Sequence, residues 1–146
     1  MSYEQLDLDA QLCFPLHTAA RAVTRAYGTL LAESGLTYPQ YLVMLALWKD
    51  DAPQSVGELG EKLRLDTGTL TPLLKRLEAA GHLERRRSVS DERKVLITVT
   101  PQGLALRDTV ADVPQRLASA ISLEEGDAER LKAMLGHIME ALDAVR

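Results

Sequence analysis

The chain is poor in the residues from which disulfides, metal sites and aromatic clusters are built. Its 146 residues include one cysteine, one tryptophan, one phenylalanine and three histidines. One cysteine cannot form an internal disulfide, and it cannot bind zinc as a CxxC pair does. These shortages argue against a disulfide-stapled secreted domain. They favour a protein of the reducing cytoplasm that carries no metal and no cofactor.

Long hydrophobic runs are also missing. No stretch of about 18 apolar residues occurs, so the sequence predicts no membrane span. The first residues, MSYEQLDLDAQL, lack the basic start and apolar stretch of a secretory signal peptide. The composition, 46% hydrophobic and 26% charged, is typical of one compact soluble domain with a hydrophobic core. We therefore expect a single cytoplasmic domain over residues 1–146 that has no membrane partner.

The net charge of −4 hides a local excess of positive charge. Residues 62–94 contain nine lysines or arginines and five aspartates or glutamates, whereas the rest of the chain has eight bases and sixteen acids. A basic segment in an acidic protein is typical of a region that meets an anionic partner, although a merely solvated face would show the same excess. The charge alone therefore leaves both interpretations open.

Hydrophobic periodicity predicts a mainly helical fold. Apolar residues recur at steps of three and four between Leu12 and Leu31, as on one face of a helix. Further helices are predicted after the N-cap residues Thr37 and Ser55, and again over residues 66–80. A helix is predicted to begin at Thr100, and a last helix at Ser122, where SLEE has the capping-box pattern.

The spacing of apolar residues changes from a helical to an alternating, strand-like pattern between residues 82 and 99. HLERRR and KVLITV read as two short strands, and SVSDE between them suits a hairpin loop. Two short helices, a tight turn and a hairpin form a winged helix-turn-helix, here about residues 37–100, with dimerisation helices at about 8–34 and 101–146. In that arrangement the second helix enters the DNA major groove and the hairpin, or wing, reaches the backbone or the minor groove.

The second helix of this motif begins with small polar residues. Threonine hydroxyls can donate hydrogen bonds to bases and phosphates, and a glycine permits close approach to the DNA. N-capping is the alternative interpretation, but one cap needs only one such residue. The predicted DNA-binding residues here are Asp66, Thr67, Gly68, Thr69, Thr71, Lys75 and Arg76.

The predicted wing is rich in arginine. An acid beside an exposed arginine, such as Asp91 beside Arg93, can hold the guanidinium extended for insertion into the minor groove. Arginines on an exposed strand also serve solubility alone, but here they fall in the same motif as the helix-turn-helix. The predicted DNA-binding residues of the wing are Arg85, Arg86, Arg87, Asp91 and Arg93.

These stretches resemble a known family. LDTGTLTPLLKRLEAAGHLERRRSVSDERKVLITVT resembles the DNA-binding core of the MarR family of bacterial transcription regulators. QLCFPLH, TYPQYLVMLALW and LDTGTLTPLLKR together resemble its organic-hydroperoxide-sensing branch, the OhrR regulators. The resemblance covers nearly the whole chain from about Gln11. It implies a homodimeric repressor that binds palindromic operator DNA and releases it when an organic hydroperoxide oxidises an N-terminal cysteine.

The resemblance also implies roles for single residues. Cys13 matches the redox sensor, and Tyr27 and Tyr38 match two tyrosines that hydrogen-bond the thiolate from the other subunit. The family usually has a third tyrosine where this chain has His17, and many members have a second cysteine that this chain lacks. Without it, oxidised Cys13 could form a mixed disulfide with a low-molecular-weight thiol, form a sulfenamide with a backbone nitrogen, or be oxidised further to a sulfinic acid.

The residues around Cys13 give an independent argument. Pro15 suits the first turn of a helix, which would place Cys13 at the positive end of the helix dipole, where a thiolate is favoured. Cys13 and Tyr27 lie 14 residues apart, roughly 21 Å along one helix, so their contact would require two chains. Against this, free cysteines usually just pack in a core. His17, on the same helical face, could assist the thiolate or only fill space.

Three functions follow from these patterns. The first is a redox-switched DNA-binding repressor. The second is a repressor of the same fold that is released by a small aromatic or phenolic ligand, with Cys13 incidental. The third, a thiol peroxidase, lacks an activating arginine-threonine-proline arrangement and would not need a basic winged helix, so we expect no enzyme. His82 and His137 lack metal-ligand spacing, and no metal site is expected.

Overall fold

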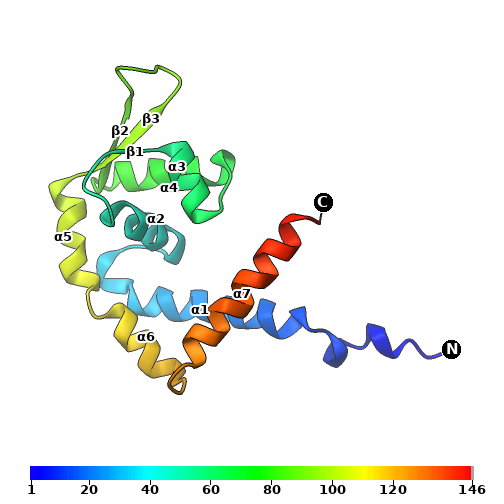
Figure 1. Cartoon of the computed structure of the whole chain (residues 1–146). Helices are drawn as coiled ribbons and strands as arrows, with labels where there is room; N and C mark the ends of the chain where they lie inside the picture. The colour runs from blue at the N-terminus through cyan, green and yellow to red at the C-terminus, as the bar shows by residue number, and fades with distance from the viewer. Residues whose placement is uncertain (146) are drawn as a thin grey trace. The chain divides into compact units, whose positions relative to one another are not determined.

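The computed structural model describes residues 1–145 and divides into two compact units, Met1–Val113 and Pro114–Arg146, which are described separately. Figure 1 labels their elements. The helices are α1 (Cys13–Leu30), α2 (Tyr38–Trp48), α3 (Val56–Leu63), α4 (Thr67–Ala79), α5 (Pro101–Val110), α6 (Val113–Ile121) and α7 (Asp127–Asp143), and the strands are β1 (Gln54–Ser55), β2 (Leu83–Arg87) and β3 (Val95–Val99). Short 3₁₀ turns occupy Glu4–Leu6, Leu8–Ala10 and Ala32–Ser34.

Side-chain caps set the starts of α2, α3 and α5 in the first unit. The Thr37 hydroxyl accepts a hydrogen bond from the Gln40 amide at 3.3 Å, and the Gln40 side chain accepts one from the Thr37 amide at 3.0 Å. This capping box starts α2. The Ser55 hydroxyl caps α3, and the Thr100 hydroxyl caps α5 by accepting from the Gly103 amide. The predictions of all three caps are confirmed.

A three-stranded antiparallel sheet adjoins α3 and α4. The strand order is β1-β3-β2, and β2 pairs with β3 from Leu83↔Val99 to Arg87↔Val95, as the predicted hairpin requires. The hairpin extends beyond the sheet and past α3 and α4 (Figure 1). Strand β1 is absent from the sequence-based prediction, because a strand of two residues is too short to show an alternating pattern. The mainly helical fold with a β-hairpin wing is confirmed.

The core of the first unit lies between the helices and the sheet. Trp48 donates from its indole nitrogen to the Gly103 carbonyl at 3.1 Å, which joins α2 to α5. A Cβ added to Gly103 would overlap the His82 carbonyl oxygen, so only glycine allows α5 to pack against the turn between α4 and β2. The fully buried side chains are Leu31, Val43, Met44, Leu47, Leu59, Leu70, Leu74, Leu77, Leu83, Ile97 and Val113.

Helix α1 begins at Cys13, and Pro15 is its third residue, as predicted. Leu12 precedes the helix and provides no side-chain cap. None of the residues of α1 is buried, although the helix carries a row of apolar residues. Tyr27 and Leu30 near its end pack partly against the core, whereas Phe14 and Leu16 near its start are exposed on the isolated chain.

The helices after the wing differ from their prediction in two ways. Helices α5 and α6 replace the one helix predicted between Thr100 and Ser122. The last helix begins at Asp127, not at the predicted cap Ser122. Ser122 has a left-handed φ of 56° and its amide bonds the Ala118 carbonyl, so it ends α6 and lacks the extended backbone of an N-cap. Gly126, also left-handed, precedes α7.

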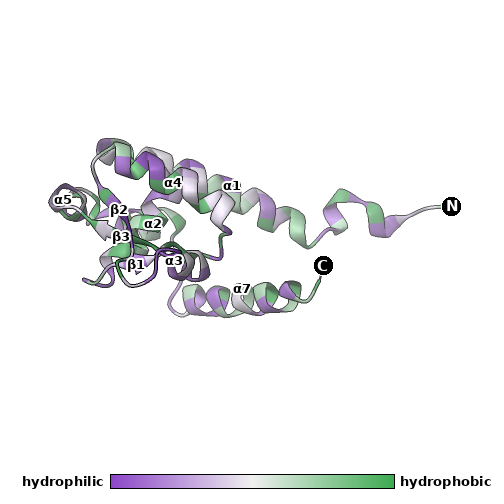
Figure 2. Ribbon diagram, turned by 90° about the horizontal axis from the view of Figure 1, so that it is seen from above, coloured by the Kyte–Doolittle hydropathy of each residue, from purple (hydrophilic) through white to green (hydrophobic). Residues whose placement is uncertain are grey.

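Helix α7 has apolar and polar residues at helical spacing, and none of its side chains is buried. Figure 2 shows apolar residues recurring along its length. The large apolar side chains that are 43% or more exposed in and beyond this helix are Leu131, Met134, Met139, Leu142 and Val145. Among residues 1–145, no helix has the length and apolar character needed to cross a membrane.

Candidate functional site

A tight turn joins α3 to α4. Arg64 adopts a left-handed conformation with a φ of 55°, and the Leu65 amide donates to the Gly60 carbonyl at 2.9 Å. A Cβ on Gly60 would approach the Leu65 carbonyl oxygen to 2.8 Å, so glycine is needed for the turn to close. This turn gives the predicted helix-turn-helix its geometry.

Asp66 is the N-cap of α4. Its carboxylate accepts a hydrogen bond from the Thr69 amide at 2.7 Å. This backbone hydrogen bond, with a further one from the Thr69 side chain, holds the pKa of Asp66 below its ordinary value. The structure therefore gives Asp66 a structural part in starting the helix, whereas its contact with DNA stays a prediction.

The outer face of α4 carries the other residues predicted for this helix. Leu70, Leu74 and Leu77 are buried on the inner face. Thr67 and Thr71 lie one turn apart on the outside, which leaves the start of the helix accessible to a ligand. The exposed predicted residues are Thr67, Gly68, Thr69, Lys75 and Arg76, and Thr71 is partly exposed.

The wing loop is pinned by its own hydrogen bonds. The amide of the buried Ser88 donates to the Lys94 carbonyl at 2.8 Å, and its hydroxyl accepts from the Asp91 amide at 3.3 Å. Asp91 also accepts from the backbone and side-chain nitrogens of Arg93 at 3.1 and 3.3 Å, while the Arg93 side chain remains 92% exposed. The expected contact between Asp91 and the exposed Arg93 is present, and insertion of Arg93 into the minor groove stays a prediction.

The other three wing arginines have different partners. Arg85 is partly buried and pairs with Glu78 of α4. Arg86 pairs with Glu84 on the same strand, and both side chains are more than half exposed. Arg87 donates to the Glu92 carbonyl at 2.9 Å. Three of the four wing arginines are thus held within the hairpin, and one is held by the neighbouring helix.

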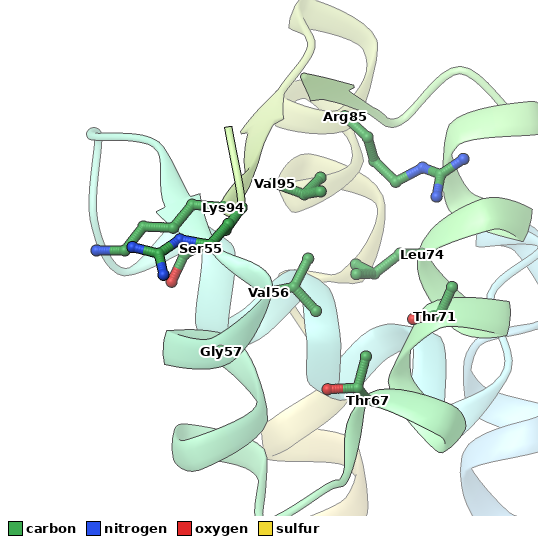
Figure 3. Close-up of a pocket in the computed structure, with 10 residues that line it drawn as sticks. Ser55, Val56, Gly57, Thr67, Thr71, Leu74, Arg85, Lys94 and Val95 are labelled. Atoms are coloured by element: carbon green, nitrogen blue, oxygen red, sulfur yellow. The ribbon is translucent and has the colours of Figure 1, made fainter. Parts of the chain in front are cut away.

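A cavity of about 400 Å³ lies between α4, the start of α3 and the wing (Figure 3). Its apolar surface comes from Val56, Leu74 and Val95. Its charged groups are Arg85, Arg93 and Lys94, and Ser55, Thr67 and Thr71 add hydroxyl groups. Predicted residues of the helix and of the wing therefore line the same concave surface.

Lys94 and the start of α3 were not among the predicted site residues. Lys94 lines the cavity, and Figure 3 shows it beside Ser55, on the other side from Arg85. The sequence signal for Lys94 was its place directly after the DER of the wing. Nothing in the sequence pattern indicated that Ser55 and Gly57 face the same cavity, because this depends on how α3 packs against the hairpin.

Three of the four predicted sensor residues lie on α1, and Tyr38 is the first residue of α2. Cys13 is exposed at the first residue of α1, and His17 is exposed one turn later. Tyr27, near the other end, stacks on Tyr38 of α2 with 4.1 Å between ring centroids and 10° between planes, and Tyr41 lies 5.6 Å from Tyr27. Within one chain, the structure brings the tyrosines together but leaves Cys13 apart from them.

Burial raises the pKa of the Tyr27 and Tyr38 hydroxyls above their ordinary value, and the neighbouring tyrosines raise that of Tyr27 further. Both hydroxyls therefore stay protonated at neutral pH and can act as hydrogen-bond donors. In residues 1–145, no cluster of histidine, cysteine, aspartate and glutamate could hold a metal ion.

The chain is similar to known transcriptional regulators. Residues 25–110 match the model of the transcriptional regulators SarA/Rot. The chain belongs to the SarA/Rot family. It is 40% identical to the organic hydroperoxide resistance transcriptional regulator of Bacillus subtilis (strain 168) over 140 residues, which are 96% of this chain and 95% of that protein.

Solved structures of a DNA-bound protein have the same fold as this chain. Reduced AbfR bound to DNA superposes with a TM-score of 0.78 at 35% identity, and the match covers 97% of this chain and 99% of AbfR. A structure of overoxidised AbfR bound to DNA gives the same values. This SarA/Rot protein is thus a transcriptional regulator with a winged helix, and not an enzyme. The resemblance to the hydroperoxide-sensing MarR-type regulators is confirmed.

Proposed function

We propose that this chain is a homodimeric repressor that binds palindromic double-stranded DNA and releases it when an organic hydroperoxide oxidises Cys13. The observation that carries the proposal is the position of the single cysteine. Cys13 is exposed at the first residue of α1, in a chain 40% identical to a regulator named for organic hydroperoxide resistance.

The DNA-binding surface in this proposal is the outer face of α4 together with the wing. Helix α4 enters the major groove, with Thr67, Thr71 and Lys75 along one face, and Arg93 enters the minor groove or contacts the backbone. The exposure of these side chains supports the proposal. So does the existence of AbfR–DNA complexes, because AbfR has the same fold.

Dimerisation is supported by the surfaces of α1 and α7. Neither helix buries a residue in the single chain, yet both carry large exposed apolar side chains. A second copy that covers these surfaces would remove them from water. A two-fold dimer would also bring Cys13 of one chain toward Tyr27 and Tyr38 of the other, as the resemblance implies, and it would match a palindromic operator.

The proposed chemistry starts with attack of the Cys13 thiolate on a peroxide oxygen. The sulfur–oxygen bond forms as the oxygen–oxygen bond breaks, and the alkoxide leaves as an alcohol after taking a proton. The sulfenic acid then condenses with a low-molecular-weight thiol, which yields a mixed disulfide and water. Because AbfR is known in an overoxidised form bound to DNA, we favour the bulky mixed disulfide over added oxygen atoms as the form that leaves DNA.

The test uses a duplex that the reduced full-length protein selects from a random pool. Fluorescence anisotropy measures its affinity before and after treatment with cumene hydroperoxide and free cysteine. We expect the native chain to lose affinity by at least about tenfold, with a mixed disulfide on Cys13 seen by mass spectrometry. Cys13→Ser should bind the duplex equally well before and after treatment. A Cys13→Ser protein that releases DNA as the native protein does would disprove the redox mechanism.

A second candidate function is supported by the cavity beside α4. Its apolar surface and its three cationic side chains suit a small aromatic anion, and a ligand there would compete with DNA. Benzoate, added to Cys13→Ser in the same assay, tests this candidate. Release of DNA by benzoate, together with no response of the native chain to peroxide, would favour this ligand-controlled repressor.

A further inference from the structure

We propose that Glu78 is a positioning residue for DNA recognition, because it locks the wing to the recognition helix α4 through Arg85. Arg85, which the sequence predicted as a DNA contact, acts in this proposal as part of the lock and not as a phosphate ligand. This inference rests on the proposed DNA binding.

Three contacts join the two residues. One carboxylate oxygen of Glu78 accepts from the Arg85 backbone amide at 2.9 Å. The other accepts from Arg85 Nε at 3.0 Å and lies 3.0 Å from a terminal guanidinium nitrogen. The pKa of Glu78 is held below its ordinary value by these bonds, the backbone amide first. The carboxylate therefore binds both the main chain and the side chain of a wing residue.

The backbone contact is specific to an edge strand. The strand order β1-β3-β2 leaves one edge of β2 without a strand partner, and Arg85 is the middle residue of β2. Glu78 lies in the last turn of α4 and occupies this edge. The helix thus satisfies an edge amide that a strand would otherwise have to satisfy.

The other wing arginines make no comparable link. Arg86 and Arg93 pair with acids two residues away, and Arg87 bonds a carbonyl in its own hairpin. Of these four arginines, only Arg85 reaches α4. Figure 3 shows its side chain extending from the strand toward this helix. Both Arg85 and Arg93 pair with an acid, but the Arg85 side chain is only 28% exposed, whereas the Arg93 side chain is 92% exposed and accessible to a phosphate.

The link matters because the helix and the wing must reach two grooves at once. Major-groove and minor-groove contacts are separated by a distance that the DNA sets, so a wing that pivots on the turn after α4 would lose register with the helix. Residues 80–82 form this turn. Strand β3 is held by backbone pairing with β1. Strand β2 is held on its outer edge by the hydrogen bond from the Arg85 amide to Glu78. The Glu78–Arg85 contact therefore fixes the spacing between the recognition helix α4 and the wing.

The test compares Glu78→Gln, Glu78→Ala, Arg85→Ala and the double variant Glu78→Ala/Arg85→Ala. Glu84→Gln is the matched control, because it also removes one carboxylate that pairs with a wing arginine, but it breaks only the surface pair with Arg86. Affinity for the duplex selected by the native protein and for a random duplex is measured at several salt concentrations. Hydroxyl-radical footprinting follows wing contacts, and dimethyl sulfate protection follows the major groove. Thermal unfolding shows which variants fold.

We expect each Glu78 variant and Arg85→Ala to bind the selected duplex about tenfold more weakly, with random-duplex affinity unchanged. Since the pair acts as a unit, the double variant should be no weaker than the weaker single variant. The slope of log K against log salt should stay at the native value in Arg85→Ala. The wing footprint should fade while major-groove protection at the centre of each half-site remains. Glu84→Gln should keep both footprints.

Two results would overturn the proposal. If Arg85 binds a phosphate, Arg85→Ala should lower the salt slope by about 0.9, and Glu78→Gln should bind more tightly because it frees Arg85. If all variants bind and footprint as the native chain does, the link has no role in recognition. Should Glu78→Ala fail to fold, the nearly isosteric Glu78→Gln decides alone. A native chain that selects no duplex would instead refute the proposed DNA binding, and the inference with it.

Discussion

The winged helix and the long helices α1 and α7 differ in how far their apolar side chains are buried. In the winged helix, Leu59, Leu70 and Ile97 are at most 1% exposed, and hydroxyl or carboxylate caps start helices α2 to α5. In α1 and α7 no residue is buried, and neither helix has a side-chain cap. The winged helix buries its own apolar side chains, whereas α7 and the first half of α1 leave large apolar side chains exposed.

This difference assigns the two regions different tasks. A region that buries its own core keeps its shape alone, which suits the constant spacing that DNA grooves demand. Helices with exposed apolar faces gain their stability from packing against a partner. In the proposed repressor, the sensor cysteine lies on such a helix, so a modified side chain there would act on packing between chains and not on the core of the winged helix.

The largest difference in the free energy of unfolding should appear between two glycine-to-alanine variants, one in the winged-helix unit and one in α7. Gly103→Ala forces a Cβ onto the His82 carbonyl oxygen, and we expect it to lower the free energy of unfolding by about 3 kcal/mol or more. A Cβ on Gly136 of α7 meets no described atom within 4 Å. Gly136→Ala should therefore raise stability by up to about 1 kcal/mol through helix propensity. Urea unfolding measures both, and equal losses would contradict the comparison.

The next largest effect concerns the assembly. Met134→Glu places a charge in the exposed apolar row of α7, where Met134 is 63% exposed. We expect monomers in sedimentation equilibrium and at least about tenfold weaker binding to the selected duplex, because only one half-site is then held. Ala133→Glu, on the polar side of the same helix, is the control and should remain dimeric. A dimeric Met134→Glu protein would show that α7 does not form the interface.

The winged helix was predictable because its signals are local. The caps Thr37, Ser55 and Thr100 act within three residues, and the hairpin strands were found from their change of period. The two-residue β1 and the Glu78–Arg85 pair depend on tertiary packing, which no local pattern records. The exposed faces of α1 and α7 resemble buried faces in sequence, so periodicity alone could not tell a chain's own core from a surface for a second chain.

A smaller effect should appear as a pH dependence that is confined to the winged helix. His82 is 9% exposed and its Nδ1 has no hydrogen-bond partner among the described residues. Burial lowers the pKa of His82 in the folded chain, while the unfolded chain takes up a proton near pH 6.5, roughly the ordinary value. The contribution of neutral His82 to the free energy of unfolding is therefore fully present above about pH 6.5. It declines as the pH falls toward the lower pKa that His82 has in the folded chain.

Urea unfolding between pH 8 and pH 5 tests this expectation. The fall in the unfolding midpoint below about pH 6.5 should shrink in His82→Gln. His137→Gln provides the control in the other region, because His137 is exposed on α7, and it should reproduce the native profile. If His82→Gln leaves the profile unchanged, another group causes the pH dependence.

The smallest effects should come from two serines that were both predicted as helix caps. Ser55 accepts from the Glu58 amide at 3.1 Å, so Ser55→Ala should lower the free energy of unfolding by about 1 kcal/mol. Ser122 caps nothing and has a φ of 56°, which glycine adopts without strain. Ser122→Gly should therefore leave stability unchanged or raise it slightly, as thermal unfolding can measure. If Ser122→Gly lowers the free energy of unfolding as much as Ser55→Ala does, Ser122 does cap α7. A side-chain cap would then also exist outside the winged helix.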